Sequence, residues 1–323
     1  MNDTPPALFS SWTPRVALFS AGLILVAILL HRLLGMPTQL ALNLFLVAFG
    51  LAACAILLGM VAIVDVWRRG ADGGAWAVIG MLIAAAVFAW PVSLLPSYLN
   101  LPAMNDATTD LASPPRFNAL IKERERAGVA NPAQYPASRL TEVQKANYPD
   151  LRPLYVSRSM DDTYELALET LKRLRFQIVA ETPPRQRQAG IIEAVDRTLV
   201  IGFYDDVVVR VESEGGRARI DVRSASRFGT HDLGRNPIRV RRVLSEMQAK
   251  VDASVATPGQ RFARIKSRLD KAKAGTKRGK ARDPKSADRR RQQDLSRSGA
   301  QRAPVPKATP PARVSGRGRD REE

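Results

Sequence analysis

Three long apolar runs occupy the first hundred residues of this 323-residue chain. They extend from Val16 to Leu34, from Leu40 to Val64 and from Ala75 to Leu95. A helix needs about 20 mostly apolar residues to cross the hydrocarbon core of a bilayer. The second and third runs meet this length without a charged residue, and the first meets it if the Arg32 side chain extends to the interface. We therefore predict that residues 1–99 form a three-helix transmembrane anchor.

Two alternatives compete with this prediction. A buried core helix could account for any one run, but three such runs in succession are typical of a membrane protein. The first run could also be a cleaved signal peptide, yet no cleavage site of small residues follows it. The second and third runs contain no ionisable residue, and ion pathways usually contain such residues. The runs therefore indicate an anchor rather than a transporter or a channel.

The basic residues near the ends of the spans predict the orientation. Arg15 precedes the first span, and Arg68 and Arg69 lie between the second and the third, whereas only Arg32 lies between the first and the second. Cytoplasmic loops are enriched in Lys and Arg. We therefore expect a cytoplasmic N-terminus and an outer location for residues 100–323.

Cysteine and histidine usage narrows the chemistry. Cys54 is the only cysteine and lies inside the second run, so no intrachain disulfide can form. His31 and His231 are far apart in the sequence, and no Cys/His spacing of a metal site occurs. We expect no metal and no cofactor. Small residues such as Gly50 and Gly59 could support helix packing, but they leave the oligomeric state open.

The C-terminal tail, residues 258–323, carries most of the net charge of +18. It is rich in Pro, Gly, Ser and Ala and has too few large apolar residues to offset the entropy of folding, so we expect a disordered Lys/Arg-rich tail. It could remain solvated without a partner, contact anionic lipid headgroups or envelope polymers, or bind nucleic acid. Nucleic acid requires a cytoplasmic tail, which the predicted orientation disfavours.

Residues 100–252 have the mixed periodicity of a separate folded domain. Ser159-x-x-Asp162 opens its strongest helical pattern, and Asn236-Pro237 is expected to cap its last helix. Three apolar segments between these helices are expected as strands: Phe176–Ala180, Gly190–Val195 and Leu199–Phe203. This order predicts an α+β fold, in which a two-layer domain of antiparallel strands carries its helices on one face.

Gly215 and Gly216 form the clearest turn signal of the domain. A two-residue loop at this point places opposite charges across the hairpin, whereas a four-residue loop would place Arg210 opposite Arg219. Like charges directly opposite are unfavourable, so we expect the two-residue loop. The predicted pairs are Glu214 with Arg217, Glu212 with Arg219, Arg210 with Asp221, Val211 with Ile220, Val209 with Val222 and Val207 with Ser224. The hairpin should then have one buried apolar face and one charged face.

Polar motifs surround this hairpin. They are Gly202-Phe203-Tyr204-Asp205-Asp206-Val207, Asp221-Val222-Arg223-Ser224-Ala225-Ser226-Arg227 and Asp232-Leu233-Gly234-Arg235-Asn236. Two earlier motifs are Asn105-Asp106-x-Thr108-Thr109-Asp110 and Tyr148-Pro149-Asp150-Leu151-x-Pro153-Leu154. Together they resemble the bacterial and plastid family catalogued as domain of unknown function 1499, in its membrane-attached form. The resemblance covers about half of the chain, residues 105–244, and implies envelope association without supplying an activity.

Ten polar residues of these motifs form the candidate site: Asp205, Asp206, Arg223, Ser224, Ser226, Arg227, His231, Asp232, Arg235 and Asn236. An Asp–Arg pair could hold the loop at residues 228–235 in place by bidentate hydrogen bonds. Alternatively, Arg223, Arg227 and Arg235 could bind an anionic or polar ligand. A third interpretation is hydrolysis by Ser224 or Ser226 with His231 and Asp232, although no nucleophile elbow is present. Adjacent carboxylates on one strand point to opposite faces, which disfavours a metal site at Asp205 and Asp206.

The sequence thus favours binding and leaves catalysis open. We expect a multi-pass protein of the bacterial cytoplasmic (inner) membrane, whose outer domain is periplasmic and binds a partner or a polar ligand. An envelope hydrolase that uses the serine, histidine and aspartate of the candidate site is the alternative. An inverted topology would instead predict a membrane protein that tethers nucleic acid through its tail.

Overall fold

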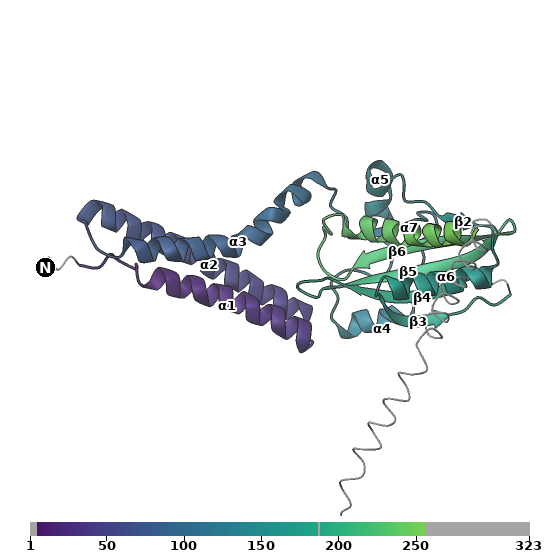
Figure 1. Ribbon diagram of the computed structural model, residues 1–323, viewed down its shortest axis with the longest axis horizontal. Helices are drawn as coiled ribbons and strands as arrows, with labels where there is room; N and C mark the ends of the chain where they lie inside the picture. Colours follow the sequence, from purple (N-terminus) through teal and green to yellow (C-terminus); the bar gives the residue numbers. More distant parts are fainter. Residues whose placement is uncertain (1–4, 187, 256–323) are drawn as a thin grey trace, which may run out of the picture. The chain divides into compact units, whose positions relative to one another are not determined.

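The computed structural model describes residues 5–186 and 188–255 (Figure 1). The predicted disordered tail, residues 258–323, lies outside the described residues. Three helices open the chain: α1 (Trp12–Leu33), α2 (Thr38–Arg69) and α3 (Gly74–Asn100). Each helix is long and apolar enough to cross a membrane. The structure therefore confirms the three predicted apolar helices as candidate membrane spans.

Small residues let these three helices pack closely. Ala17 of α1, Ala52 and Ala55 of α2 and Ala84 of α3 form one buried cluster. A Cβ atom at Gly80 of α3 would lie only 2.5 Å from the backbone nitrogen of Pro14, so glycine is required at that approach. In α2, a Cβ atom at Gly59 would clash with Met81 Cγ, whereas one at Gly50 would meet no atom within 4 Å.

An antiparallel sheet forms the centre of the following domain (Figure 1). Its strand order is β1, β6, β5, β4 and β3, and β2 pairs with β6 as well. The strands are β1 (Asp106–Thr108), β2 (Leu154–Val156), β3 (Gln177–Thr182), β4 (Gly190–Arg197), β5 (Tyr204–Glu214) and β6 (Arg217–Ser226). The α+β prediction is confirmed.

The hairpin of β5 and β6 has the predicted register. Arg210 lies opposite Asp221, Val211 opposite Ile220, and Val207 opposite Ser224. The apolar face is buried, as predicted, but the charged face is exposed only near the turn, at Glu214 and Arg217. Asp221 is fully buried and Arg223 is 1% exposed. The segment between α3 and α5 covers this face, which the strand pattern by itself does not show.

Leu199–Phe203, predicted as a strand, is a loop between β4 and β5, so that prediction is wrong. The loop closes on Thr198, whose backbone nitrogen donates to the Phe203 carbonyl oxygen at 2.8 Å. The Thr198 hydroxyl oxygen also accepts hydrogen bonds from the backbone nitrogens of Gly202 and Phe203. The apolar side chains of this segment therefore leave the sheet, although their composition is typical of a strand.

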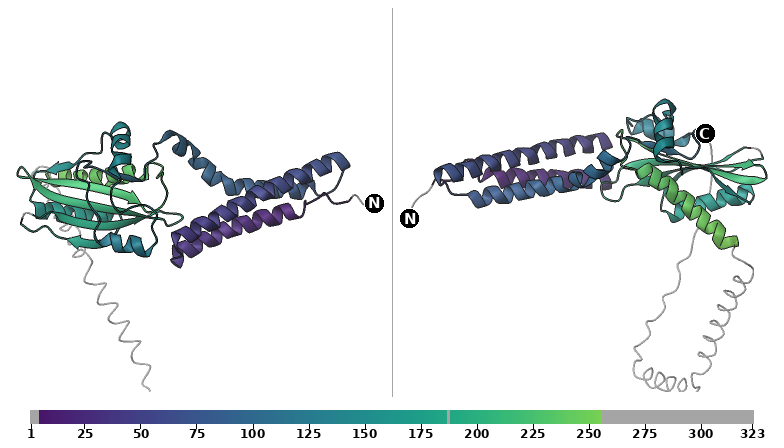
Figure 2. Two further views of the ribbon diagram at one scale, coloured as in Figure 1. Left: turned by 180° about the vertical axis from the view of Figure 1, so that it is seen from behind. Right: turned by 90° about the horizontal axis from the view of Figure 1, so that it is seen from above.

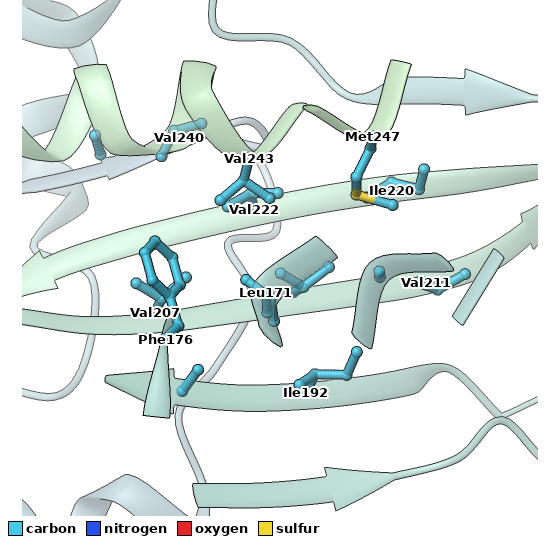
Figure 3. Packing of buried hydrophobic residues seen from close by; sticks show 14 of the residues in the cluster. Leu171, Phe176, Ile192, Val207, Val211, Ile220, Val222, Val240, Val243 and Met247 are labelled. Carbon is cyan, nitrogen blue, oxygen red and sulfur yellow. The ribbon is translucent and has the colours of Figure 1, made fainter. Parts of the chain in front are cut away.

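The two longest helices of the domain pack on one face of the sheet. They are α6 (Met160–Arg173) and α7 (Arg235–Val255). Figure 3 shows Val240, Val243 and Met247 of α7 over Ile220 and Val222 of β6, and all five side chains are buried in one core. In the right-hand view of Figure 2 the sheet is seen nearly edge-on, with α7 in light green on one side.

Helix α6 begins as the sequence predicts. The Ser159 hydroxyl oxygen accepts a hydrogen bond from the Asp162 backbone nitrogen at 3.0 Å, which is the geometry of an N-cap.

Two shorter helices belong to the segment that precedes α6. They are α4 (Ala119–Arg126) and α5 (Ala137–Asn147). Phe117 and Leu120 of the α4 region pack with Val208 and Ala225 in a second, smaller core. These strand residues alternate with the residues that face α7, so the α4 region covers the opposite face of the sheet. The predicted helix layer is thus present, and the second face has its own cover.

Candidate functional site

Strand alternation divides the ten predicted site residues between the two faces of the sheet. Asp205 and Asp206 are neighbours on β5, yet they bind different partners on opposite faces, as alternation requires. The face with α4 holds Asp206, Arg223 and Arg227. The face with α7 and its preceding loop holds Asp205, Ser224, Ser226, His231, Asp232, Arg235 and Asn236. The predicted residues therefore form two separate groups.

On the α4 face, Asp206 is fully buried between two arginines. Arg227 donates to Asp206 Oδ1 from Nε at 2.9 Å and from Nη2 at 2.6 Å. Arg124 of α4 donates from Nη1 to the other carboxylate oxygen. Arg227 also reaches Glu123 at 3.2 Å. The pair expected from the sequence is present, and Arg124 is a partner that sequence reasoning missed.

Arg223 is fully engaged on the same face. Its Nη2 lies 2.7 Å from Asp106 Oδ2, and it also donates to the carbonyl oxygens of Pro115 and Ala133. Burial raises the pKa of Asp106 against the lowering effect of Arg223. The Phe117 ring lies 4.6 Å from the guanidinium carbon. A cavity of about 410 Å³ adjoins Arg223, but this arginine's donors are already directed to protein groups.

A further charged network joins β5 and β6 to residue 110. Asp110 accepts hydrogen bonds from Arg210 Nη2 at 2.9 Å and from Arg219 Nη2 at 2.8 Å. Arg210 also donates to Asp221 at 2.9 Å, across the predicted pair. Burial would raise the pKa of Asp110, but hydrogen bonds from the Ser113 backbone and Arg210 outweigh it and lower that pKa. The sequence predicted the cross-strand pair and missed Asp110, because its contact spans about a hundred residues.

On the α7 face, Arg239 is the central cation. It is 5% exposed and donates to Asp205 at 2.6 Å and to Asp196 at 2.7 Å. Burial would lower the pKa of the guanidinium, but the two carboxylates outweigh it and raise that pKa. Sequence reasoning missed Arg239, although a signal existed. It lies one helical turn before Val243, on the buried stripe of α7.

The two predicted serines serve the same network. The Ser224 hydroxyl donates to Asn236 Oδ1 at 2.7 Å and accepts from Arg239 Nη1 at 2.9 Å. Ser226 accepts from Asn236 Nδ2 at 2.9 Å. Asn236 therefore holds the end of β6 against the start of α7, rather than acting as the predicted helix cap.

His231 and Asp232 also bind the backbone. His231 Nδ1 accepts from the Leu233 backbone nitrogen at 2.9 Å, so Nε2 donates to the Leu101 carbonyl oxygen at 3.0 Å. Asp232 accepts from the backbone nitrogens of Gly234 and Asn236 and caps α7, and burial raises its pKa. Within residues 5–186 and 188–255, no serine hydroxyl bonds to His231. The arrangement of a Ser-His-Asp hydrolase is therefore not assembled.

Loop 198–203, the connection between β4 and β5, contacts the first membrane helix. The His31 ring nitrogen Nδ1 lies 3.0 Å from the Ile201 carbonyl oxygen, and Arg32 donates to the Thr198 carbonyl oxygen at 3.0 Å. Arg197 donates in return to the Arg32 carbonyl oxygen at 2.6 Å. Ile201 itself is buried with Phe45 of α2. The segment predicted as a strand thus packs against the first two apolar helices.

A cavity of about 440 Å³ lies beside this contact and is here called the membrane-proximal pocket. Its apolar walls come from loop 198–203, the loop before α7, and helices α2 and α3. Its lining residues are Thr38, Leu42, Trp90, Leu94, Thr198, Leu199, Val200, Ile201, Phe203, Tyr204, Asp205, Ser226, Phe228, Gly229, His231, Asp232, Leu233 and Arg235. Five of the ten predicted site residues are among them: Asp205, Ser226, His231, Asp232 and Arg235.

Arg235 differs from the other charged groups of this pocket. Its side chain is exposed, and in the part of the chain that the structure describes it forms no hydrogen bond or ion pair. Asp205 is held by Arg239, and Asp232 by backbone nitrogens. Arg235 is thus a cation left available at the wall of a mostly apolar pocket.

Comparison with known proteins agrees with the motifs. A family model described as protein of unknown function (DUF1499) matches residues 106–247. The match confirms the resemblance drawn from the sequence. No curated protein matches the chain.

Proposed function

We propose that this membrane-anchored protein is a ligand-binding module that takes its ligand into the membrane-proximal pocket. The observation that carries the proposal is the composition of that pocket, where an apolar wall surrounds one exposed and unbonded arginine among the described residues. Pockets for small molecules are mostly apolar and contain a few polar groups that set the orientation of the ligand. The volume of about 440 Å³ lies within their usual range.

The remaining polar clusters support the fold rather than a ligand. Asp206, Arg223 and Arg239 each direct their polar atoms to other protein groups, and each is almost fully buried. Buried charges of this kind are retained when they are paired. A binding role through Arg223 or Arg227, considered from the sequence, therefore has less support than binding beside Arg235.

The outer side of the membrane remains the favoured location of the domain. Its support is the distribution of arginines, since Arg15, Arg68 and Arg69 flank the ends that would face the cytoplasm. The ligand would then come from the extracytoplasmic space or from the membrane itself. An outer location also places the tail away from nucleic acid, so this proposal includes no nucleic-acid partner.

Leu94→Trp tests the pocket by filling it from the α3 side. We expect that compounds extracted from purified full-length protein include species that the variant lacks, as detected by mass spectrometry. Leu95→Trp is the matched control, because Leu95 is half-exposed and does not line the pocket. The control should retain the wild-type compounds. Indistinguishable extracts from all three proteins would contradict a ligand in this pocket.

A further inference from the structure

A second cavity adjoins the membrane-proximal pocket. It measures about 490 Å³ and lies among α1, α2 and α3, with lining residues that include Ile24, Phe45 and Ile83. Every residue that lines it is apolar. It shares Trp90, Val200 and Ile201 with the membrane-proximal pocket. We call it the inter-helix cavity, and the shared wall makes the two spaces neighbours.

The residues between the two cavities suit a bilayer environment. Leu199 is 83% exposed and Val200 is 60% exposed, at the tip of a loop that contacts the membrane helices. Exposing such apolar side chains to water is unfavourable, whereas contact with the hydrocarbon of a membrane is favourable. The walls of the inter-helix cavity come from helices that are long and apolar enough to span a membrane. A molecule can therefore reach these cavities from the lipid phase.

The polar end of this space is cationic. Arg235 lines the membrane-proximal pocket, Arg32 donates to the carbonyl oxygen of the lining residue Thr198, and Arg197 precedes Thr198 in the chain. None of the three has a carboxylate partner among residues 5–186 and 188–255, and Arg32 and Arg197 donate to carbonyl oxygens. The acidic groups of the pocket are already engaged, as described for Asp205 and Asp232. An anionic group would find unopposed donors here.

We propose that the two cavities together hold one anionic membrane lipid. Its acyl chain occupies the inter-helix cavity, and its phosphate lies in the membrane-proximal pocket beside Arg235. Arginine binds phosphate by two parallel hydrogen bonds, and basic pockets between membrane helices recognise lipid headgroups. The inference rests on the proposed function, because it names the class of ligand for the same pocket.

The test uses full-length protein in detergent, loaded with an equimolar mixture of phosphatidylglycerol and phosphatidylcholine of equal chain length. Native mass spectrometry then measures the ratio of the two lipids retained. We expect wild type to retain phosphatidylglycerol in preference. Arg235→Gln should reduce that preference about fivefold, which corresponds to about 1 kcal/mol for one basic residue near a lipid surface. Arg242→Gln, at an exposed position of the same helix, should leave it unchanged.

A second pair of variants tests the chain site. Ala86→Trp fills the inter-helix cavity and should abolish retention of both lipids, whereas Ala85→Trp, at an exposed neighbouring position outside the cavity, should not. Glycerol phosphate, which has the headgroup without the chain, should not compete. Competition by glycerol phosphate would overturn the lipid assignment. So would lipid retention that is unchanged in both the Arg235→Gln and the Ala86→Trp variants.

The experiments distinguish an error in the lipid assignment from an error in the ligand-binding function. If the Leu94→Trp variant loses extracted compounds but lipid retention is unchanged in the Ala86→Trp and Arg235→Gln variants, the lipid assignment is wrong and the ligand-binding function is still supported. Extracts that do not depend on Leu94 would contradict the proposed function itself.

Discussion

Replacing Asp206 with alanine is expected to destabilise the α+β domain by about 3–5 kcal/mol, the usual cost of removing one partner from a buried ion pair. Asp206 is fully buried, and it neutralises Arg124 and Arg227, which are 3% and 7% exposed. Without the carboxylate, Arg124 loses its ion pair with Asp206, and Arg227 keeps only the longer contact with the partly exposed Glu123 at 3.2 Å among the described residues. Pulse proteolysis of the full-length protein across a urea gradient measures the free energy of unfolding of the domain.

Two further variants make the Asp206 experiment specific. Arg227→Ala should cost less than Asp206→Ala, because the carboxylate keeps Arg124 as a partner. Asp252→Ala, at an exposed position of α7, should stay within about 0.5 kcal/mol of wild type. A fully stable Asp206→Ala protein would show that this cluster does not hold the fold and would return it to the candidates for ligand binding.

Arg239→Met should also cost about 3–5 kcal/mol, since methionine keeps the length and apolar character of the side chain but leaves Asp205 buried and unpaired. Ser224 and Asn236 lose the hydrogen bonds from Arg239 at the same time. The same urea series measures the loss.

Arg242→Met is the matched control on the exposed side of α7 and should have little effect. The double variant Arg239→Met with Asp205→Asn should be more stable than Arg239→Met alone, because it no longer buries an unpaired carboxylate. A double variant that is no better than the single one would mean that the charge of Asp205 is not what Arg239 stabilises.

The hairpin register could be predicted from the sequence because every relevant interaction is local. Gly215 and Gly216 set the turn, and the opposite charges of Arg210 and Asp221 select the pairing. The membrane helices could be predicted for a similar reason, since a long uncharged run has few other stable environments.

The Leu199–Phe203 prediction failed because periodicity does not report where an apolar side chain finds its partner. The segment has the composition of a strand, but Ile201 packs with Phe45 of α2, far away in the sequence. A local pattern that contradicts the observed structure often marks a functional region. In this chain it marks the wall shared by the two cavities.

The candidate site was only partly predictable. The motifs contain Asp206, Arg227 and Asn236, which do form buried polar contacts. They do not show that these residues lie on two faces with separate partners, or that Arg124 and Arg239 complete the clusters. Those partners come from helices whose packing depends on the whole fold.

We propose that the pocket-bearing domain meets its ligand at the outer surface of the membrane. Two fusions to a reporter that is active only outside the cytoplasm test it directly, one placed after Leu99 and one after Gly70. We predict an active fusion after Leu99 and an inactive one after Gly70, because Arg68 and Arg69 favour a cytoplasmic loop. An inactive fusion after Leu99 with an active one after Gly70 would place the domain in the cytoplasm and contradict a ligand site at the outer surface.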